Sequence, residues 1–100
     1  LCATNRDADA CAGALRRTGL ETVMLTDYSG AVTDRVKVGT IKRAKGLEFK
    51  QVLVARMRES LFGNVAPGAD DGARERWEIE RRELYVGMTR ARDGLWVGLV

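Results

Sequence analysis

The pattern of apolar positions in the first quarter of the chain predicts a helix followed by a strand. Apolar residues recur three and four positions apart, which places them on one helix face: Ala8, Cys11, Ala12 and Leu15. Thr4 or Asn5 can cap the start of this helix, and Gly19 suits the left-handed residue that ends one. Residues 22–25 then predict a short buried strand, and residues 1–4 resemble the end of another strand.

The alternation of strands and helices continues to the end of the chain. Three apolar segments predict strands, at residues 35–40, 51–55 and 95–99. Two segments rich in turn-forming residues predict loops, at residues 26–34 and 60–73. A longer helix is expected from about Arg74 to Arg92, and its apolar face is formed by Trp77, Leu84, Met88 and Ala91.

This order of elements predicts an α/β fold with a mostly parallel central sheet. With 100 residues, 45% of them hydrophobic, the chain suits a single domain, residues 1–100, around one core. It has no apolar run near the ~20 residues that cross a bilayer, so no membrane partner is expected. It begins without Met or an apolar leader, which we interpret as a fragment of a longer protein.

The chain has two cysteines and no histidine, which limits its metal chemistry. Cys2 and Cys11 alone cannot complete a zinc site, and no metal-ligand spacing is present, so no metal site is expected. Cys11 falls on the apolar face of the first helix and is expected to be a buried free thiol. Free thiols are typical of a reducing compartment, so a cytoplasmic protein is expected.

The net charge of +3 is small, but basic residues are concentrated in one part of the chain. Residues 35–58 carry eight basic side chains against one acid, Glu48. Such an excess attracts phosphate polyanions, including nucleic acid, through counterion release. Charge alone leaves two interpretations open: a nucleic-acid surface, or a solvated basic face without a partner.

The first candidate for chemistry is the block at residues 40–49, expected to form a loop or a single helical turn around Gly46. Thr40 would end the preceding strand at the carboxyl edge of the sheet, where ligands gather in parallel sheets. Its hydroxyl suits a phosphate oxygen, and Gly46 allows a close backbone approach. Glu48 either pairs with a neighbouring base or hydrogen-bonds a ribose hydroxyl. The block lacks the glycine and hydroxyl spacing of a phosphate-binding loop, and no other segment has it.

The second candidate is the block at residues 80–92, on the predicted long helix. Arg90 lies near the end of that helix and is open to two interpretations. It either stabilises the negative end of the helix dipole or acts as a finger that places its guanidinium on a γ-phosphate. Trp77 and Tyr85 are expected to be core or packing residues, with base stacking as the alternative.

Together the two blocks resemble motifs V and VI of the UvrD/Rep-type superfamily 1 helicases. Thr40-x-x-x-Ala-Lys-Gly-Leu-Glu-Phe49 is similar to motif V. Arg81-Arg-x-Leu-Tyr-Val-Gly-Met-Thr-Arg-Ala91 is similar to motif VI, in the expected order. The resemblance covers nearly the whole chain, including the helix end at residues 14–19. It implies a RecA-like three-layer domain, the second of two in these helicases, called 2A.

The resemblance also implies half of a composite ATP site. A first RecA-like domain, absent from this chain, would carry the phosphate-binding loop and hold most of ATP and Mg²⁺. Lys45 and Gly46 would lie near the phosphates, Glu48 would contact the ribose, and Arg90 would be the catalytic arginine finger. Three further residues would contact single-stranded DNA: Thr40, Lys42 and Arg43.

Two departures from the family pattern limit what the resemblance implies. The family usually has histidine where this chain has Lys42, so a phosphate contact remains but imidazole stacking is lost. Many members carry a large 2B insertion before motif V, whereas only the short loop 26–34 is expected here. The 2B insertion is therefore expected to be absent.

The implied function is the C-terminal motor lobe of an ATP-dependent DNA helicase or translocase, of the kind that serves DNA repair. Without a phosphate-binding loop, the 100 residues alone are not expected to hydrolyse ATP. An alternative is a non-helicase binding or regulatory module of a UvrD-like protein coupled to a nuclease or RNA polymerase. A third is a basic nucleic-acid-binding domain that uses no nucleotide.

Overall fold

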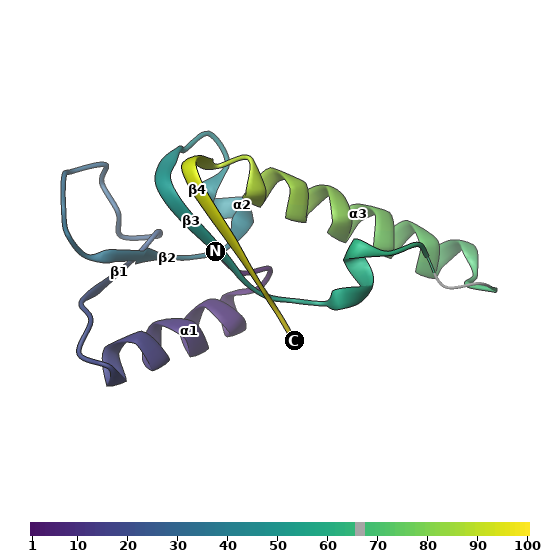
Figure 1. Ribbon diagram of the computed structural model, residues 1–100, viewed down its shortest axis with the longest axis horizontal. Coiled ribbons are helices and arrows are strands. Elements are labelled where there is room, and N and C mark those ends of the chain that lie inside the picture. Colours follow the sequence, from purple (N-terminus) through teal and green to yellow (C-terminus); the bar gives the residue numbers. More distant parts are fainter. Residues whose placement is uncertain (66–67) are drawn as a thin grey trace.

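The computed structural model describes residues 1–65 and 68–100 and shows an α/β fold (Figure 1). β1 (Thr22–Met24) pairs with β2 (Val36–Val38), and β3 (Phe49–Met57) pairs with β4 (Ala91–Leu99). Both pairs are parallel. The predicted α/β class and parallel pairing are therefore confirmed for these strands.

The first two residues join the two strand pairs. Cys2 makes backbone hydrogen bonds of 3.0 and 2.9 Å to residues 39 and 41, and forms a parallel bridge with Thr40. Leu1 makes hydrogen bonds of 2.7 and 2.8 Å to residues 53 and 55 of β3. The order across the sheet is therefore β1, β2, residues 1–2, β3, β4, with the start of the chain in the middle.

Helices cover both faces of this sheet. α1 (Asn5–Arg17) contacts β1 and β2, and α3 (Asp71–Met88) contacts β3 and β4 (Figure 1). Leu1 packs against the cluster that includes Leu84 of α3, whereas Cys2 belongs to the cluster that includes Ala12 of α1. Because successive side chains of an extended segment point to opposite faces, α1 and α3 lie on opposite sides of the sheet.

The predicted start and end of α1 are confirmed. The Thr4 hydroxyl accepts a hydrogen bond of 3.1 Å from the Asp7 backbone N–H, as an N-cap residue does. Gly19 follows the last turn with a φ of 90°, a conformation that glycine adopts without a steric penalty. Capping chemistry therefore fixes both ends of this helix.

The block at residues 40–49 forms a single helical turn followed by an extended return to the sheet. α2 (Ile41–Ala44) is capped by Thr40 and packs against α3. Ile41 and Ala44 are fully buried, and Ile41 packs in the cluster that includes Leu84 of α3. The expected helical turn is therefore present, but it ends before Gly46 rather than surrounding it.

The predicted loop at residues 60–73 is wrong at both ends. A 3-10 helix, η1 (Glu59–Phe62), occupies its start, and α3 begins at Asp71. The backbone N–H of Ala73 donates to the Asp70 carboxylate at 2.7 Å, so Asp70 caps the helix earlier than the expected Arg74. The turn signal at Pro67 lies outside the described residues.

The end of α3 also differs from the prediction. The helix stops at Met88, because Thr89 caps it: its backbone N–H donates to Tyr85 and its hydroxyl donates to Val86. β4 then begins at Ala91, so Arg90 lies in the turn and Arg92 on a strand. The prediction that the helix continues to Arg92 is wrong, because Ala91 pairs with Phe49 and β4 therefore begins at Ala91.

Three predictions of side-chain burial have different outcomes. Trp77 is half-buried, and its indole N–H donates to the Ser60 carbonyl at 3.0 Å, which confirms a packing role. Tyr85 is 67% exposed, because Leu84 and its neighbours occupy the face of α3 that meets the sheet. Cys11 is only half-buried, and the fully buried thiol belongs to Cys2.

Candidate functional site

The candidate ATP residues gather at the amino ends of β3 and β4. The Phe49 backbone N–H donates to the Arg90 carbonyl at 2.8 Å, just before the two strands pair. The turn that follows α2 and the turn that follows α3 therefore meet at one edge of the molecule (Figure 1). The structure brings Lys45, Gly46 and Glu48 to the same edge as Arg90.

The Arg90 guanidinium is held by three oxygen atoms. Its Nε donates to the Val86 carbonyl at 3.2 Å, at the end of α3. One terminal nitrogen lies 3.4 Å from the Leu47 carbonyl, and the other lies 3.3 Å from the Thr89 hydroxyl. These contacts place a half-buried cation at a helix C-terminus, where the dipole stabilises it, and join it to the turn after α2.

Gly46 redirects the chain from α2 to β3. It has a φ of 81°, and a side chain added there would meet no heavy atom within 4 Å. Its backbone is therefore accessible, which fits a close approach by a ligand. Lys45 before it is exposed and ends α2 as its C-cap residue.

Glu48 presents a solvent-exposed carboxylate at this edge. Within the part of the chain that the structure describes, it forms no ion pair with a neighbouring base. Of the two interpretations offered by the sequence, internal ion pairing is therefore not the arrangement adopted by these residues. The carboxylate is free to accept a hydrogen bond from a hydroxyl group.

The candidate DNA-binding residues lie at a different place, at the carboxyl end of β2. The Thr40 hydroxyl accepts a hydrogen bond of 3.2 Å from the Arg43 backbone N–H, so it caps α2. Lys42 and Arg43 are exposed beside it. Thr40 lies level with Ala55 of β3, about six residues or roughly 20 Å along the strand direction from Phe49. Lys42 and Arg43 lie on α2 itself, between Thr40 and the Lys45–Glu48 turn.

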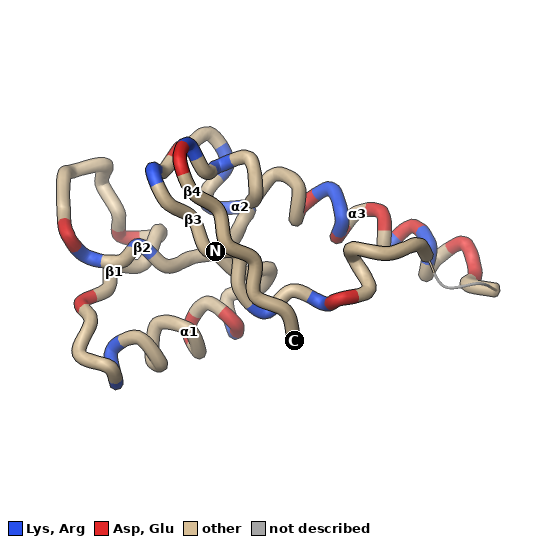
Figure 2. The backbone as a smooth tube through the Cα atoms, viewed as in Figure 1, with Lys and Arg blue, Asp and Glu red and all other residues tan. Residues whose placement is uncertain are grey.

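The basic residues divide into paired and unpaired sets. Within residues 35–58, three are engaged by acids: Arg35 with Glu21 at 3.7 Å, Arg56 with Asp7 at 2.9 Å, and Arg58 with Glu80. Four exposed basic residues of the same segment form no ion pair with any described residue, namely Lys42, Arg43, Lys45 and Lys50. Figure 2 shows basic residues gathered along α2 and the turn into β3. In this segment, the exposed positive charge without an ion pair therefore lies around the candidate sites.

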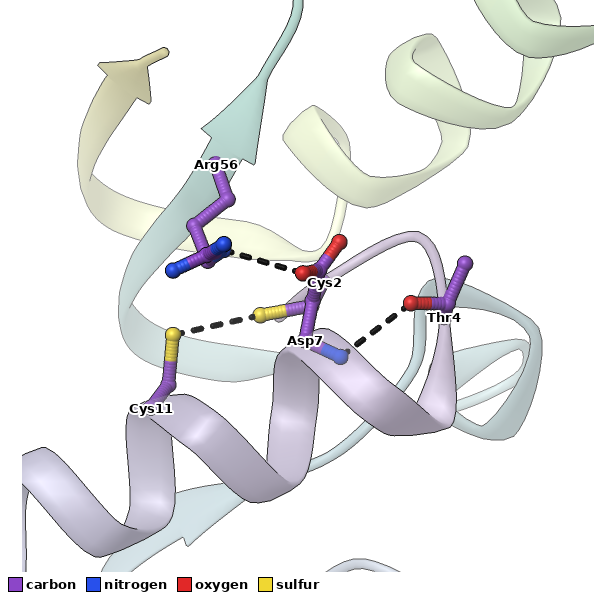
Figure 3. Close-up of polar contacts among 5 residues, drawn as sticks. All are labelled: Cys2, Thr4, Asp7, Cys11 and Arg56. Carbon is purple, nitrogen blue, oxygen red and sulfur yellow. Dashed lines mark hydrogen bonds and ion pairs between the residues drawn. The ribbon is translucent and has the colours of Figure 1, made fainter.

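Sequence patterns did not predict the conformation of Arg56. This residue has a φ of 61°, which is uncommon for a residue with a side chain, and it lies where the β3–β4 register shifts. Its Nε donates to the Asp7 carboxylate on α1 (Figure 3). An arginine in a strand carries no local sign of such a bulge. The roles of Leu47 and Thr89 as partners of Arg90 were also missed, because the Leu47 partner is a backbone carbonyl.

A cavity of about 490 Å³ opens on the α1 side of the sheet. Apolar side chains that line it include Leu15, Val38, Leu53 and Trp96, and none of the predicted site residues does. The candidate ATP residues therefore lie at an open edge rather than in this cavity.

Two further properties concern residues 1–65 and 68–100. No helix in these ranges has the length and apolar character needed to cross a membrane. No group of three or more metal-ligating side chains was found in the same ranges.

Comparison with known proteins identifies the family. The sequence model of the UvrD-like helicase C-terminal domain matches residues 1–100. DNA helicase II of Escherichia coli K12 is 45% identical over 62 residues, which are 62% of this chain and 8% of that protein. ATP-dependent DNA helicase PcrA of Staphylococcus aureus is 39% identical over 75 residues, which are 74% of this chain and 10% of that protein.

A solved structure shares the fold. The C-terminal domain of a possible DNA helicase from Lactobacillus plantarum WCFS1 aligns with a TM-score of 0.72 and 23% identity. The alignment covers 99% of this chain and 53% of that one. The chain thus spans about a tenth of the length of its curated relatives, and the family match extends over all of its residues. It belongs to the UvrD-like helicase C-terminal domain family.

Proposed function

We propose that this chain is the C-terminal motor lobe of an ATP-dependent DNA helicase or translocase. The proposal rests on one observation above the others: Arg90 and the Lys45–Glu48 turn meet at one edge through the contact of Arg90 with Leu47. Residues over 40 positions apart are therefore held as one unit. The names of the related proteins, DNA helicase II and ATP-dependent DNA helicase PcrA, support the same function.

The unit fits one side of an ATP molecule. Glu48 would accept a hydrogen bond from a ribose hydroxyl, and Lys45 would lie near the phosphates, where the open Gly46 backbone leaves room. The Arg90 guanidinium would turn toward the γ-phosphate and stabilise the negative charge that develops there. ATP, with Mg²⁺, supplies the phosphoryl group whose transfer to water drives the motor.

The rest of the ATP site would belong to another domain. The sequence contains no phosphate-binding loop, so we assign that loop and the Mg²⁺ ligands to a first RecA-like domain of a longer protein. The parallel sheet with helices on both faces is compatible with a RecA-like three-layer arrangement in this lobe as well. We place no 2B insertion in this lobe, because only the segment 25–35 separates β1 from β2.

DNA would bind at the other end of α2. Thr40, Lys42 and Arg43 lie at the carboxyl end of β2, and the two cations have no acidic partner among the described residues. Because α2 connects these residues to the Lys45–Glu48 turn, closure of the lobe on ATP would shift the DNA contacts. This arrangement links ATP hydrolysis to movement along single-stranded DNA.

The test is replacement of Arg90 in a full-length protein that carries this chain. Arg90→Ala should lower the rate of ATP turnover by at least ~10², because the finger stabilises transition-state charge. Arg92→Ala is the matched control, since Arg92 is exposed on β4 and pairs with Asp93 at 3.5 Å. Thermal unfolding of each variant separates loss of the finger from loss of the fold.

If a folded Arg90→Ala variant turns over ATP at the wild-type rate, Arg90 is not the arginine finger. If DNA affinity of the full-length protein is also unaffected by ATP, the chain acts as a basic nucleic-acid-binding module without a nucleotide. The unpaired cations at residues 42–50 are the observation that favours this second function.

A further inference from the structure

The two thiols of the chain lie next to one another. The Cys2 thiol donates a hydrogen bond to the Cys11 sulfur, and the two Sγ atoms are 3.6 Å apart (Figure 3). A disulfide needs a separation near 2.05 Å, so the sulfur atoms must approach by about 1.5 Å. Rotation of the half-buried Cys11 side chain can supply a movement of this size.

The pair joins two elements that the fold depends on. Cys2 belongs to the segment that joins the two strand pairs, and Cys11 lies in the middle of α1. Asp7, one turn before Cys11 on the same face of α1, pairs with Arg56 of β3. The two contacts together fasten one face of α1 to the sheet (Figure 3).

We propose that Cys2 and Cys11 are a modification site: they form a reversible intrachain disulfide that fixes α1 to the centre of the sheet. This inference is independent of the ATP and DNA sites. The oxidant would be a low-molecular-weight disulfide such as oxidised glutathione. One protein disulfide forms and one glutathione disulfide is broken, two thiols are oxidised, and two glutathione thiols are released.

The surroundings of the two thiols decide which of them attacks the glutathione disulfide first. Burial, together with the hydrogen bond to Cys11, raises the pKa of Cys2 to about 12, so this thiol stays protonated at neutral pH. The Cys11 thiolate would therefore attack the glutathione disulfide first, and Cys2 would then attack the Cys11 sulfur and release glutathione. The titratable side chains that face Cys2 are those of Cys11 and Asp7. The second step should accelerate as pH rises from 7 to 9.

The experiment equilibrates the chain with reduced and oxidised glutathione, with and without denaturing urea, followed by acid quenching and peptide mass spectrometry. The fold should raise the effective concentration of the two thiols at least about tenfold over the urea sample. The oxidised chain should also unfold at a temperature higher by at least about 5 °C, an effect that dithiothreitol reverses.

Single variants serve as controls for the two steps. In Cys2→Ser, Cys11 should accumulate as a mixed disulfide with glutathione, and in Cys11→Ser the buried Cys2 should remain unmodified. Equal effective concentrations with and without urea would overturn the proposal. Accumulation of a glutathione adduct on wild-type Cys11, or of disulfide-linked dimers, would overturn it as well.

Discussion

Gly39 lies between the buried Val38 and Thr40, where the end of β2 passes Leu25 of the preceding segment. A methyl group at this position would lie 2.7 Å from the Leu25 Cβ, closer than real Cβ contacts. Leu25 is buried and its Cβ is fixed by the backbone, so a change of rotamer cannot relieve the clash. We expect Gly39→Ala to lower the free energy of unfolding by about 1–3 kcal/mol, measured by urea denaturation.

Gly13→Ala provides the control, because it is the same substitution in the middle of α1. The nearest atom to the added methyl would be the flexible end of Arg17, at 3.5 Å, an ordinary contact. Alanine favours a helix over glycine, so this variant should gain up to ~1 kcal/mol. If both variants change the unfolding midpoint in the same direction, close packing at Gly39 is not the cause.

Single residues were predictable where their chemistry has a local cause. The Thr4 cap and the left-handed Gly19 follow from side-chain type and position, and both predictions are confirmed. The exposure of Tyr85 and the positive φ of Arg56 were not predictable, because each depends on which segment packs nearby. Tertiary contacts decide these positions, and single residues do not reveal them.

At the scale of elements, α3 depends on its cap. The Asp70 carboxylate accepts the Ala73 backbone N–H at 2.7 Å, and this contact starts a helix of 18 residues. We expect Asp70→Ala to lower the free energy of unfolding by about 1 kcal/mol, read from the urea midpoint. Asp70→Asn keeps an oxygen that can cap, so it should lose less than Asp70→Ala. Equal losses would show that charge at the helix start matters and the cap bond does not.

The sequence predicted most of the named elements but not all their bounds. Amphipathic spacing and apolar runs located α1, β3 and α3. Strand ends were missed, because the pairing of Phe49 with Ala91 extends both strands into segments with polar sequences. Pairing energy comes from the neighbouring strand, so a single segment does not contain that information.

Within residues 35–58, the exposed cations without an acidic partner lie between Lys42 and Lys50. Lys42 and Arg43 are exposed and have no acidic partner in the described ranges, whereas Arg35 pairs with Glu21. If both cations contact phosphates, replacing them with Gln should make the salt slope of single-stranded DNA binding less negative by about 1.4. Fluorescence anisotropy at several salt concentrations measures this slope.

Arg35→Gln is the matched control for that measurement. It removes one exposed positive charge that is already paired with Glu21, so the slope should change little. An unchanged slope in the Lys42→Gln, Arg43→Gln double variant would place the DNA contacts elsewhere on the chain.

The candidate ATP residues were identified from the sequence, but their geometry was not. Motif order placed Lys45, Glu48 and Arg90 in one group, and parallel pairing of β3 with β4 brings them to one edge. The sequence did not indicate that Arg90 binds backbone carbonyls at the end of α3 and in the turn before β3. Carbonyl groups are present at every position, so only folding selects the ones that a side chain can reach.

The position of Leu1 and Cys2 in the middle of the sheet affects how the chain can fold during synthesis. Leu1 pairs with Leu53, which is synthesised 52 residues later. Until then α1 can form, but the strand beside it has no partner on the β3 side. The two strand pairs of the sheet can therefore join only after residues 49–57 have been synthesised.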